Sequence, residues 1–128
     1  MASEDDWEWA REEIRKGRVR IGYSETACPG TYAAQAMVYG LPMPIATVWF
    51  RHVGNATMDT LQSFVITPLR RCGLRTLLHR DMIKAYPECN RVVTGSGSPE
   101  GGKAWLKATG FKQNAEGDWV YRIKKRDR

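Results

Sequence analysis

The sequence feature that most constrains the fold is an apolar segment that ends at Pro68 and is followed, beyond Gly73, by a leucine-rich segment. Residues 61–67 favour a strand because they are rich in branched and aromatic side chains, and Pro68 ends strand pairing because it has no backbone donor. Residues 73–86 predict a helix, since apolar residues recur at helical spacing: Leu74, Leu77, Leu78, Met82 and Ile83. Residues 91–94 predict another strand, so the three segments form a right-handed parallel crossover.

The segments around this unit predict further strands and helices. The alanine-rich residues 32–38 make a helix conceivable there. The other expected elements are a helix capped by Ser3 and ending at Gly17, strands at 18–23, 45–53 and 57–67, a helix at 100–108, and a final hairpin of 111–113 with 119–123. This order predicts an α+β domain built on a mixed, mostly antiparallel sheet.

Length and composition limit the class of protein. The chain has 128 residues, 42% of them hydrophobic and 27% charged, so we expect one domain spanning residues 1–128. No apolar run approaches the roughly 18 to 20 residues of a membrane-spanning helix, and an acidic amino terminus does not fit a secretory signal. Three widely spaced cysteines predict neither a disulfide framework nor a zinc knuckle: Cys28, Cys72 and Cys89. We therefore expect a cytoplasmic protein with reduced thiols and no membrane partner.

Two segments hold the main local excesses of positive charge in a chain of net charge +6. Residues 122–128 hold +4, which a frayed, solvated carboxyl end explains, with the basic tail at residues 124–128. The second segment surrounds Gly73 and contains Arg70, Arg71, Arg75 and Arg80. Gly73 permits close backbone approach, the first amides of the following helix lack helical partners, and the arginines supply positive charge. This combination predicts an anion cradle; the alternative is an ordinary loop with solvated arginines.

Two motifs in the chain resemble those of the GCN5-related N-acetyltransferases, abbreviated GNAT. The first, which resembles motif A of that family, consists of Ile66-x-Pro68, then Arg70-x-x-Gly73-x-Arg75, then Leu77-Leu78. The second is similar to motif B and runs from Ala104 to Phe111, with Gly110 before the phenylalanine. The resemblance covers roughly residues 33–123 and leaves the helix and strand expected at residues 1–30 divergent.

The resemblance implies a site for acetyl-coenzyme A between the strand that ends at Thr67 and the strand at 91–94. It implies that the pantetheine pairs with the backbone of Phe64, Val65 and Ile66. The pyrophosphate would then bind to the loop and helix start formed by Arg70, Arg71, Cys72, Gly73, Leu74, Arg75 and Thr76. The activity implied is transfer of an acetyl group to a primary amine of a small molecule or protein by direct attack.

The residues that assist this reaction in the family are altered here. The position of the usual tyrosine acid, four residues before Gly110, holds Leu106, and the position of a common asparagine holds Pro99. Asp59 is a candidate base, or a solvated strand-edge carboxylate, and Ser98 is a candidate proton donor to the thiolate. His52 and His79 are expected at the surface or partly satisfied, and no metal is expected. An inactive GNAT-fold protein, serving as a coenzyme A-binding or protein-interaction module, is therefore the alternative function.

Other classes fit the sequence less well. Residues 97–103 have the glycine and lysine spacing of a phosphate-binding loop, but Ala104 replaces the hydroxyl residue that holds magnesium. Nucleic acid is not an expected partner because no zinc-finger or RNA-recognition motif occurs. Several acidic residues suit a cationic acceptor or a solvated helix face: Glu4, Asp5, Asp6, Glu8, Glu12 and Glu13. The final hairpin offers an exposed edge for a homodimer.

Overall fold

Across residues 3–95 and 100–128, which the computed structural model describes, seven strands form one sheet in the order β1-β2-β3-β4-β5-β7-β6. The pairs are antiparallel except β4 with β5, which are parallel, so the expected mixed sheet is confirmed. The elements are α1 (Glu4–Arg15), β1 (Arg20–Glu25), β2 (Thr31–Met37), β3 (Ala46–Val53), β4 (Thr57–Val65), the 3-10 turn η1 (Thr67–Leu69), α2 (Leu74–Ala85), β5 (Arg91–Thr94), α3 (Glu100–Thr109), β6 (Lys112–Gln113), β7 (Trp119–Arg122) and the 3-10 turn η2 (Lys125–Asp127).

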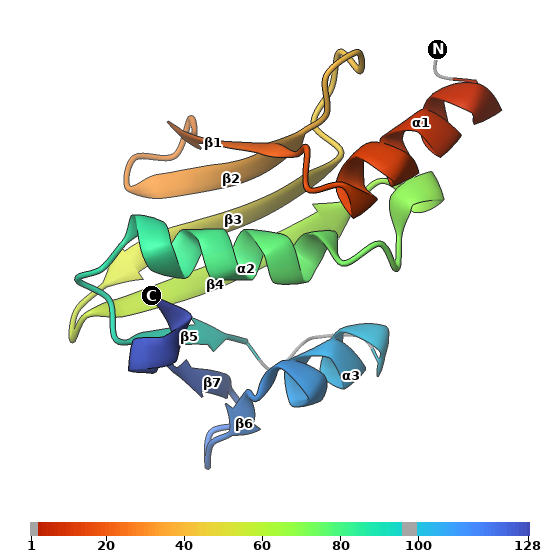
Figure 1. Ribbon diagram of the computed structural model, residues 1–128. Helices are drawn as coiled ribbons and strands as arrows, with labels where there is room; N and C mark the ends of the chain where they lie inside the picture. The colour runs from red at the N-terminus through yellow and green to blue at the C-terminus, as the bar shows by residue number, and fades with distance from the viewer. Residues whose placement is uncertain (1–2, 96–99) are drawn as a thin grey trace.

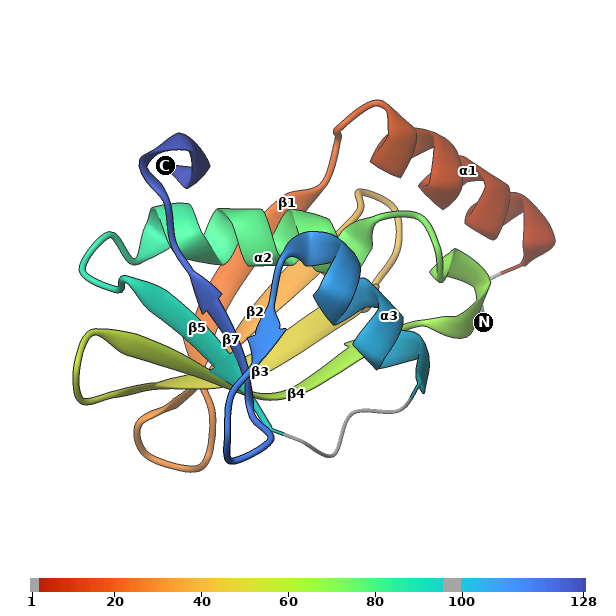
Figure 2. The ribbon, with the colours of Figure 1, turned by 90° about the horizontal axis from the view of Figure 1, so that it is seen from below.

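The helices α1, α2 and α3 lie on the same side of the sheet, and α2 crosses the central strands (Figures 1 and 2). The core lies between α2 and that face, where Phe50, Met58 and Leu78 are completely buried. The cap expected at Ser3 is present and forms a capping box, since Ser3 and Asp6 exchange hydrogen bonds between side chain and backbone. The crossover from β4 through α2 to β5 is also confirmed.

The alanine-rich segment is a strand, so the helix considered for residues 32–38 is wrong. The backbone of β2 pairs with β1 on one side and β3 on the other, which gives it partners along both edges. Ala34 and Ala36 are completely buried. Small side chains let the sheet approach α2 closely here, and this packing outweighs the helix preference of alanine.

Strands β4 and β5 pair only at their beginnings and then diverge. Residues 57–60 pair with residues 91–94, whereas β4 continues to Val65 in contact with β3 alone among the described strands. The register with β3 shifts where Phe50 faces Thr60 and Trp49 faces Gln62, which leaves Leu61 as the extra residue of a bulge. The bulge bends β4 at the point where it leaves β5, and so opens the sheet.

The frayed tail expected at residues 124–128 is wrong. These residues form η2, and Asp127 accepts hydrogen bonds from the Tyr121 hydroxyl at 2.7 Å and from the Lys124 amide at 2.8 Å. The Arg128 guanidinium donates to the backbone carbonyls of Pro87 and Cys89. The tail is therefore held against the turn that precedes β5. Within the described ranges, no helix has the length and apolar character needed to cross a membrane.

Candidate cofactor cleft

The loop between β4 and α2 is held from both sides. Leu69, in η1, is completely buried and anchors the loop to the core. From the other side, the Arg11 guanidinium of α1 donates to the carbonyl of Pro68 at 3.1 Å. The divergent amino-terminal helix thus braces the segment in which motif A was found.

The end of this loop presents a run of backbone donors. Gly73 caps α2 with φ +80°, and Arg71 also has a positive φ of 65°. The first helical bond runs from the Leu77 amide to the Gly73 carbonyl at 3.0 Å. Among the described residues, none of the amides from Arg71 to Thr76 has a hydrogen-bond acceptor. Such amides at a helix amino terminus form a binding site for an anion such as a phosphate.

The arginines around these amides have separate positions. Arg70 and Arg71 are exposed, and the Nε of Arg70 donates to the Val65 carbonyl at 3.3 Å. Arg75 instead turns toward α3, where its guanidinium lies 4.2 Å from the ring centre of Trp105. Burial lowers the pKa of Arg75, but the guanidinium stays charged at neutral pH because its ordinary pKa is so high.

The edge of β4 beside this loop exposes backbone groups. The Ile66 amide points toward β3, because it donates to the Ile45 carbonyl at 3.0 Å. Since successive residues of a strand point their backbone groups to alternate sides, the groups of Val65 point away from β3, into the opening beside β5. The Arg70 contact with the Val65 carbonyl agrees with this direction. Val65, rather than Ile66, therefore offers pairing groups to a ligand that lies along the edge.

A small cavity lies where the strands diverge. Its volume is about 20 Å³, enough for about one water molecule. Thr60 and Thr94, the last register pair of β4 and β5, line it together with Arg75 and Leu106. Leu106 is the residue at the position of the family's tyrosine, so a charged guanidinium shares the cavity with the aliphatic side chain that replaces the acid.

The wall of the cavity also contains His79, which is buried and not at the surface as was considered. Its ring packs against Trp105, Phe111 and Tyr121, at centre distances of 5.7, 5.5 and 4.9 Å. Burial lowers the pKa of His79 to about 4, and Nε2 has no hydrogen-bond partner in the described structure. The ring is therefore neutral near pH 7 and does not serve as a cation for phosphate.

The two predicted catalytic candidates do not meet at this cavity. Asp59 precedes Thr60 in β4, so its side chain points to the opposite face of the sheet, where it pairs with Arg51 at 3.1 Å. A groove of about 650 Å³ on that face is lined by Asp59, Arg91 and Asp118, among others. Ser98 lies outside the described residues, as does Pro99. His52 is exposed, as expected.

Sequence reasoning missed the contacts that join the two motifs. The Trp105 indole donates to the Thr76 hydroxyl at 2.9 Å, in addition to stacking under Arg75. Both motifs were recognised separately. The arginine at the last motif A position and the tryptophan in motif B could therefore have been predicted to pair. The contact between Arg11 and the loop had no such signal, because a single surface arginine has no pattern.

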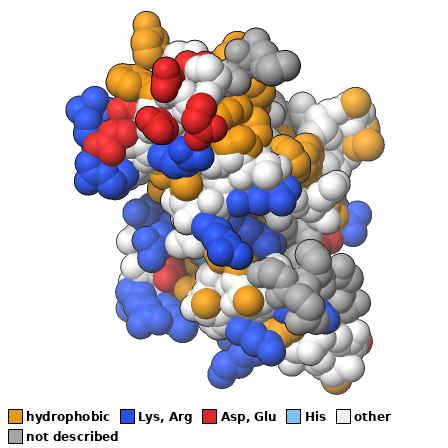
Figure 3. Space-filling model, turned by 90° about the vertical axis from the view of Figure 1, so that its right-hand side faces the viewer, with side chains coloured by type: hydrophobic (Ala, Val, Ile, Leu, Met, Phe, Trp, Pro, Cys, Tyr) orange, Lys and Arg blue, Asp and Glu red, His pale blue; other side chains and the backbone are white. Residues whose placement is uncertain are grey.

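Acidic and basic side chains occupy different parts of the surface around the cleft. Figure 3 shows acidic side chains gathered at the top of this view and basic side chains across its middle. Three of the six acidic residues of α1 are engaged within the helix: Asp6 caps it, Glu4 pairs with Arg11, and Glu12 pairs with Arg15. Glu13 is buried beside Arg18. The acids of α1 are therefore largely occupied by arginines of the same region, and Asp5 and Glu8 are the ones for which the described structure gives no pair.

These features define an α+β protein whose sheet opens beside a loop with amides free to accept an anion as ligand. No protein-family model and no curated protein matches the chain. Solved structures do match: a Bacillus subtilis acetyltransferase in complex with CoA has a TM-score of 0.67 at 11% identity, covering 83% of this chain and 99% of that one. The putative N-acetyltransferase YhhK from E. coli, bound to coenzyme A, has a TM-score of 0.63 at 16% identity, with coverage of 96% and 93%.

A GNAT family acetyltransferase from Elizabethkingia anophelis with acetyl-CoA bound gives the same TM-score of 0.63 at 12% identity, covering 82% of this chain and 98% of that one. The likeness to these proteins extends over most of both chains in each comparison. The chain therefore has the GNAT fold, as the two motifs predicted.

Proposed function

We propose that this protein is an acetyl-coenzyme A-dependent N-acyltransferase that moves an acetyl group to a primary amine. The observation that carries the proposal is the run of amides from Arg71 to Thr76 without acceptors in the described structure, beside the open edge of β4. The amides suit a pyrophosphate, and the Val65 backbone suits the amide groups of a pantetheine arm. The coenzyme A or acetyl-CoA bound to similar structures supports the same ligand class.

The acyl transfer itself requires little covalent help from the protein. The neutral amine attacks the thioester carbonyl carbon, a carbon–nitrogen bond forms, and the carbon–sulfur bond breaks. The coenzyme A thiolate leaves and takes up the proton that the amine loses, so the products are an amide and free coenzyme A. The protein contributes by holding the donor and by stabilising the charge that develops on oxygen and sulfur.

We infer that Arg75 stabilises the leaving thiolate. Its guanidinium lies against Trp105 and lines the cavity that Leu106 also lines. A tyrosine would supply a proton at this point, whereas an arginine supplies a positive charge and hydrogen-bond donors without being deprotonated. We assign Arg75 this role within the proposed function.

The inactive alternative is favoured by one specific observation. Leu106 is completely buried, so the aliphatic replacement of the acid belongs to the core of the domain. A coenzyme A-binding module without turnover would tolerate this change. Binding and catalysis must therefore be measured separately.

The first experiment is a thermal-unfolding titration of the full chain with acetyl-coenzyme A. A ligand at about 100 times its dissociation constant adds roughly 2.7 kcal/mol to the free energy of unfolding, so the melting temperature rises by several degrees. Release of free thiol is then measured with a panel of primary amines. Binding with turnover supports the enzyme, binding without turnover supports the inactive module, and no binding overturns both.

The acceptor and the compartment belong to the same proposal. The paired acids of α1 weaken the case for an acceptor recognised by that helix, so the amine panel includes neutral and cationic amines. The free thiols of Cys28, Cys72 and Cys89 fit a reducing compartment such as the cytoplasm.

A homodimer would use an edge of the sheet, and β6 of the final hairpin is one of the two outer strands of that sheet in the described structure.

A further inference from the structure

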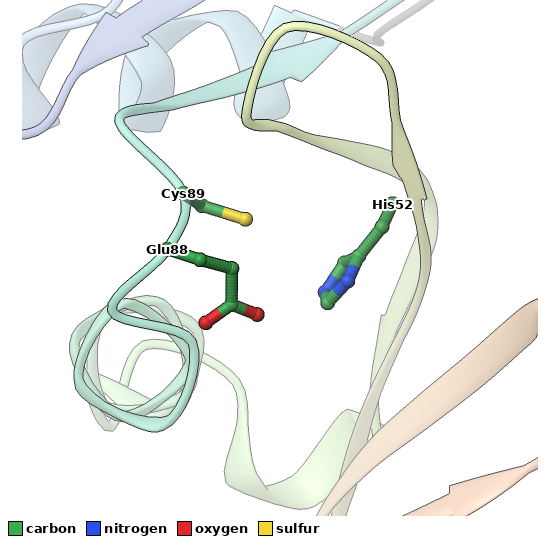
Figure 4. Close-up of side chains that lie close together, drawn as sticks. All are labelled: His52, Glu88 and Cys89. Atoms are coloured by element: carbon green, nitrogen blue, oxygen red, sulfur yellow. The ribbon is translucent and has the colours of Figure 1, made fainter.

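A second group of reactive side chains lies at the other end of β4, away from the cofactor cleft. His52 is near the end of β3, and Glu88 and Cys89 lie in the connection from α2 to β5. One imidazole nitrogen, one carboxylate oxygen and the Cys89 sulfur all lie within 4.8 Å of one another. Figure 4 shows the three side chains directed toward the same gap between these segments.

The three groups are a typical ligand set for one metal ion. Zn²⁺ takes cysteine sulfur, histidine nitrogen and carboxylate oxygen at about 2.0 to 2.3 Å, in tetrahedral geometry. Such ligand atoms lie about 3.5 Å apart, so a shift of about 1 Å in the side chains completes the geometry. His52 and Glu88 are exposed and free to make this adjustment, whereas Cys89 is 2% exposed and has a fixed position.

Neighbouring groups hold Cys89 in place and pack against one side of the His52 ring. The Cys89 amide donates to the Tyr86 carbonyl at 3.1 Å, and the Cys89 carbonyl accepts from Arg128. The His52 ring packs edge-on against Tyr86, with ring centres 4.5 Å apart. In the described structure no hydrogen bond or ion pair engages the side chains of His52, Glu88 or Cys89, so all three remain available to a cation.

We propose that His52, Glu88 and Cys89 bind one Zn²⁺ ion, with water at the fourth position on the exposed side. The ion joins the connection between α2 and β5 to the end of β3, and so stabilises the parallel crossover. His52 faces Met58 in β4, whereas the cofactor loop begins after Val65, roughly 20 Å further along the strand. The ion is therefore separate from the cofactor loop, and the proposal does not depend on acyl transfer.

The test is a titration of the full-length, chelator-treated protein with Co²⁺ and with Zn²⁺. Co²⁺ reports a cysteine ligand through a thiolate-to-metal absorption band in the near ultraviolet. We expect one Co²⁺ per chain with this band, displacement of Co²⁺ by Zn²⁺, and a rise in melting temperature with Zn²⁺.

The variants distinguish this site from other thiols. Cys89→Ser should remove the band, while Cys28→Ser and Cys72→Ser should keep it. His52→Gln and Glu88→Gln change exposed residues, so they should fold normally and each lower the Co²⁺ affinity at least about tenfold.

Absence of the band in the unaltered protein overturns the proposal, as does a band that survives Cys89→Ser. Unchanged Co²⁺ affinity in both His52→Gln and Glu88→Gln also overturns it. This test can be made even if Cys89→Ser fails to fold. Coenzyme A binding is measured on the same preparations and should not change.

Discussion

The two ends of β4 carry two proposed sites of different construction. At its carboxyl end, the cofactor cleft is made largely by one continuous segment from Val65 to Thr76, with α3 and α1 packed against it. At its amino end, His52 meets Glu88 and Cys89 from across the crossover. Each end has a histidine and a cysteine, yet only the continuous segment was recognisable in the sequence. A site built from one continuous turn can be recognised as a sequence motif. A site whose residues are brought together by the pairing of strands can be recognised only once the fold is known.

The largest expected effect comes from Gly73→Asp, which acts on the turn alone. A carboxylate next to the unpartnered amides repels the pyrophosphate, and a like-charge contact costs several kcal/mol. We expect coenzyme A affinity to fall at least about 100-fold, measured by calorimetry. Zn²⁺ binding at the other end of β4 should be unchanged.

Gly30→Asp is the matched control. Gly30 and Gly73 both have φ +80°, and a Cβ at either position would meet no atom within 4 Å. Both substitutions therefore carry a similar backbone strain of about 1 kcal/mol, but only Gly73 lies in the cleft. Equal losses of coenzyme A affinity in the two variants would refute the assignment of the loop.

The two histidines give the next comparison, through the pH dependence of stability. Burial lowers the folded-state pKa of His79 to about 4, whereas an unfolded histidine titrates near 6.5. As the pH falls below 6.5, the unfolded chain takes up a proton that the folded chain does not, so stability falls until about pH 4. The difference in pKa corresponds to a loss of about 3 kcal/mol over this window.

Urea unfolding between pH 7 and pH 4 measures this loss. His79→Leu should remove most of it, and should cost little at pH 7 because Nε2 has no partner in the described structure. His52→Gln, at the exposed histidine, should keep the full pH dependence. The interpretation fails if the two variants have the same pH profile.

The sequence predicted features that depend on neighbouring residues and missed those that depend on contacts formed by the fold. Local patterns located the crossover, because Pro68, Gly73 and the leucine spacing act within a few residues of one another. They misread β2, where packing against α2 overrode the helix preference of alanine, and they misread the tail, where Asp127 finds Tyr121 only after folding. The position of Arg75 over Trp105 was likewise set by the packing of α2 on α3.

Arg75 tests whether the cleft is more than a binding site. Arg75→Ala removes the cation beside the leaving sulfur, so we expect kcat to fall about 10- to 100-fold with a smaller change in KM. Arg75→Lys should recover part of kcat, since it restores the charge without the planar stacking. Arg71→Ala, at an exposed arginine of the same loop, should raise KM with kcat nearly unchanged. Identical effects of Arg75→Ala and Arg71→Ala would show that Arg75 only binds phosphate.

The smallest expected effect is that of Asp59→Asn, which asks whether the opposite face of the sheet takes part in the chemistry. Asp59 pairs with Arg51 and points away from the cavity at Thr60, so a base at Asp59 has no described path to that cavity. We expect less than about a tenfold loss of kcat, and a loss of stability below about 1 kcal/mol, as for other partly exposed ion pairs. Arg51→Gln should have the same small effect on stability, because it breaks the same pair. A loss of kcat near 10³-fold in Asp59→Asn alone would make Asp59 the base and place the acceptor amine in the groove beside Arg91.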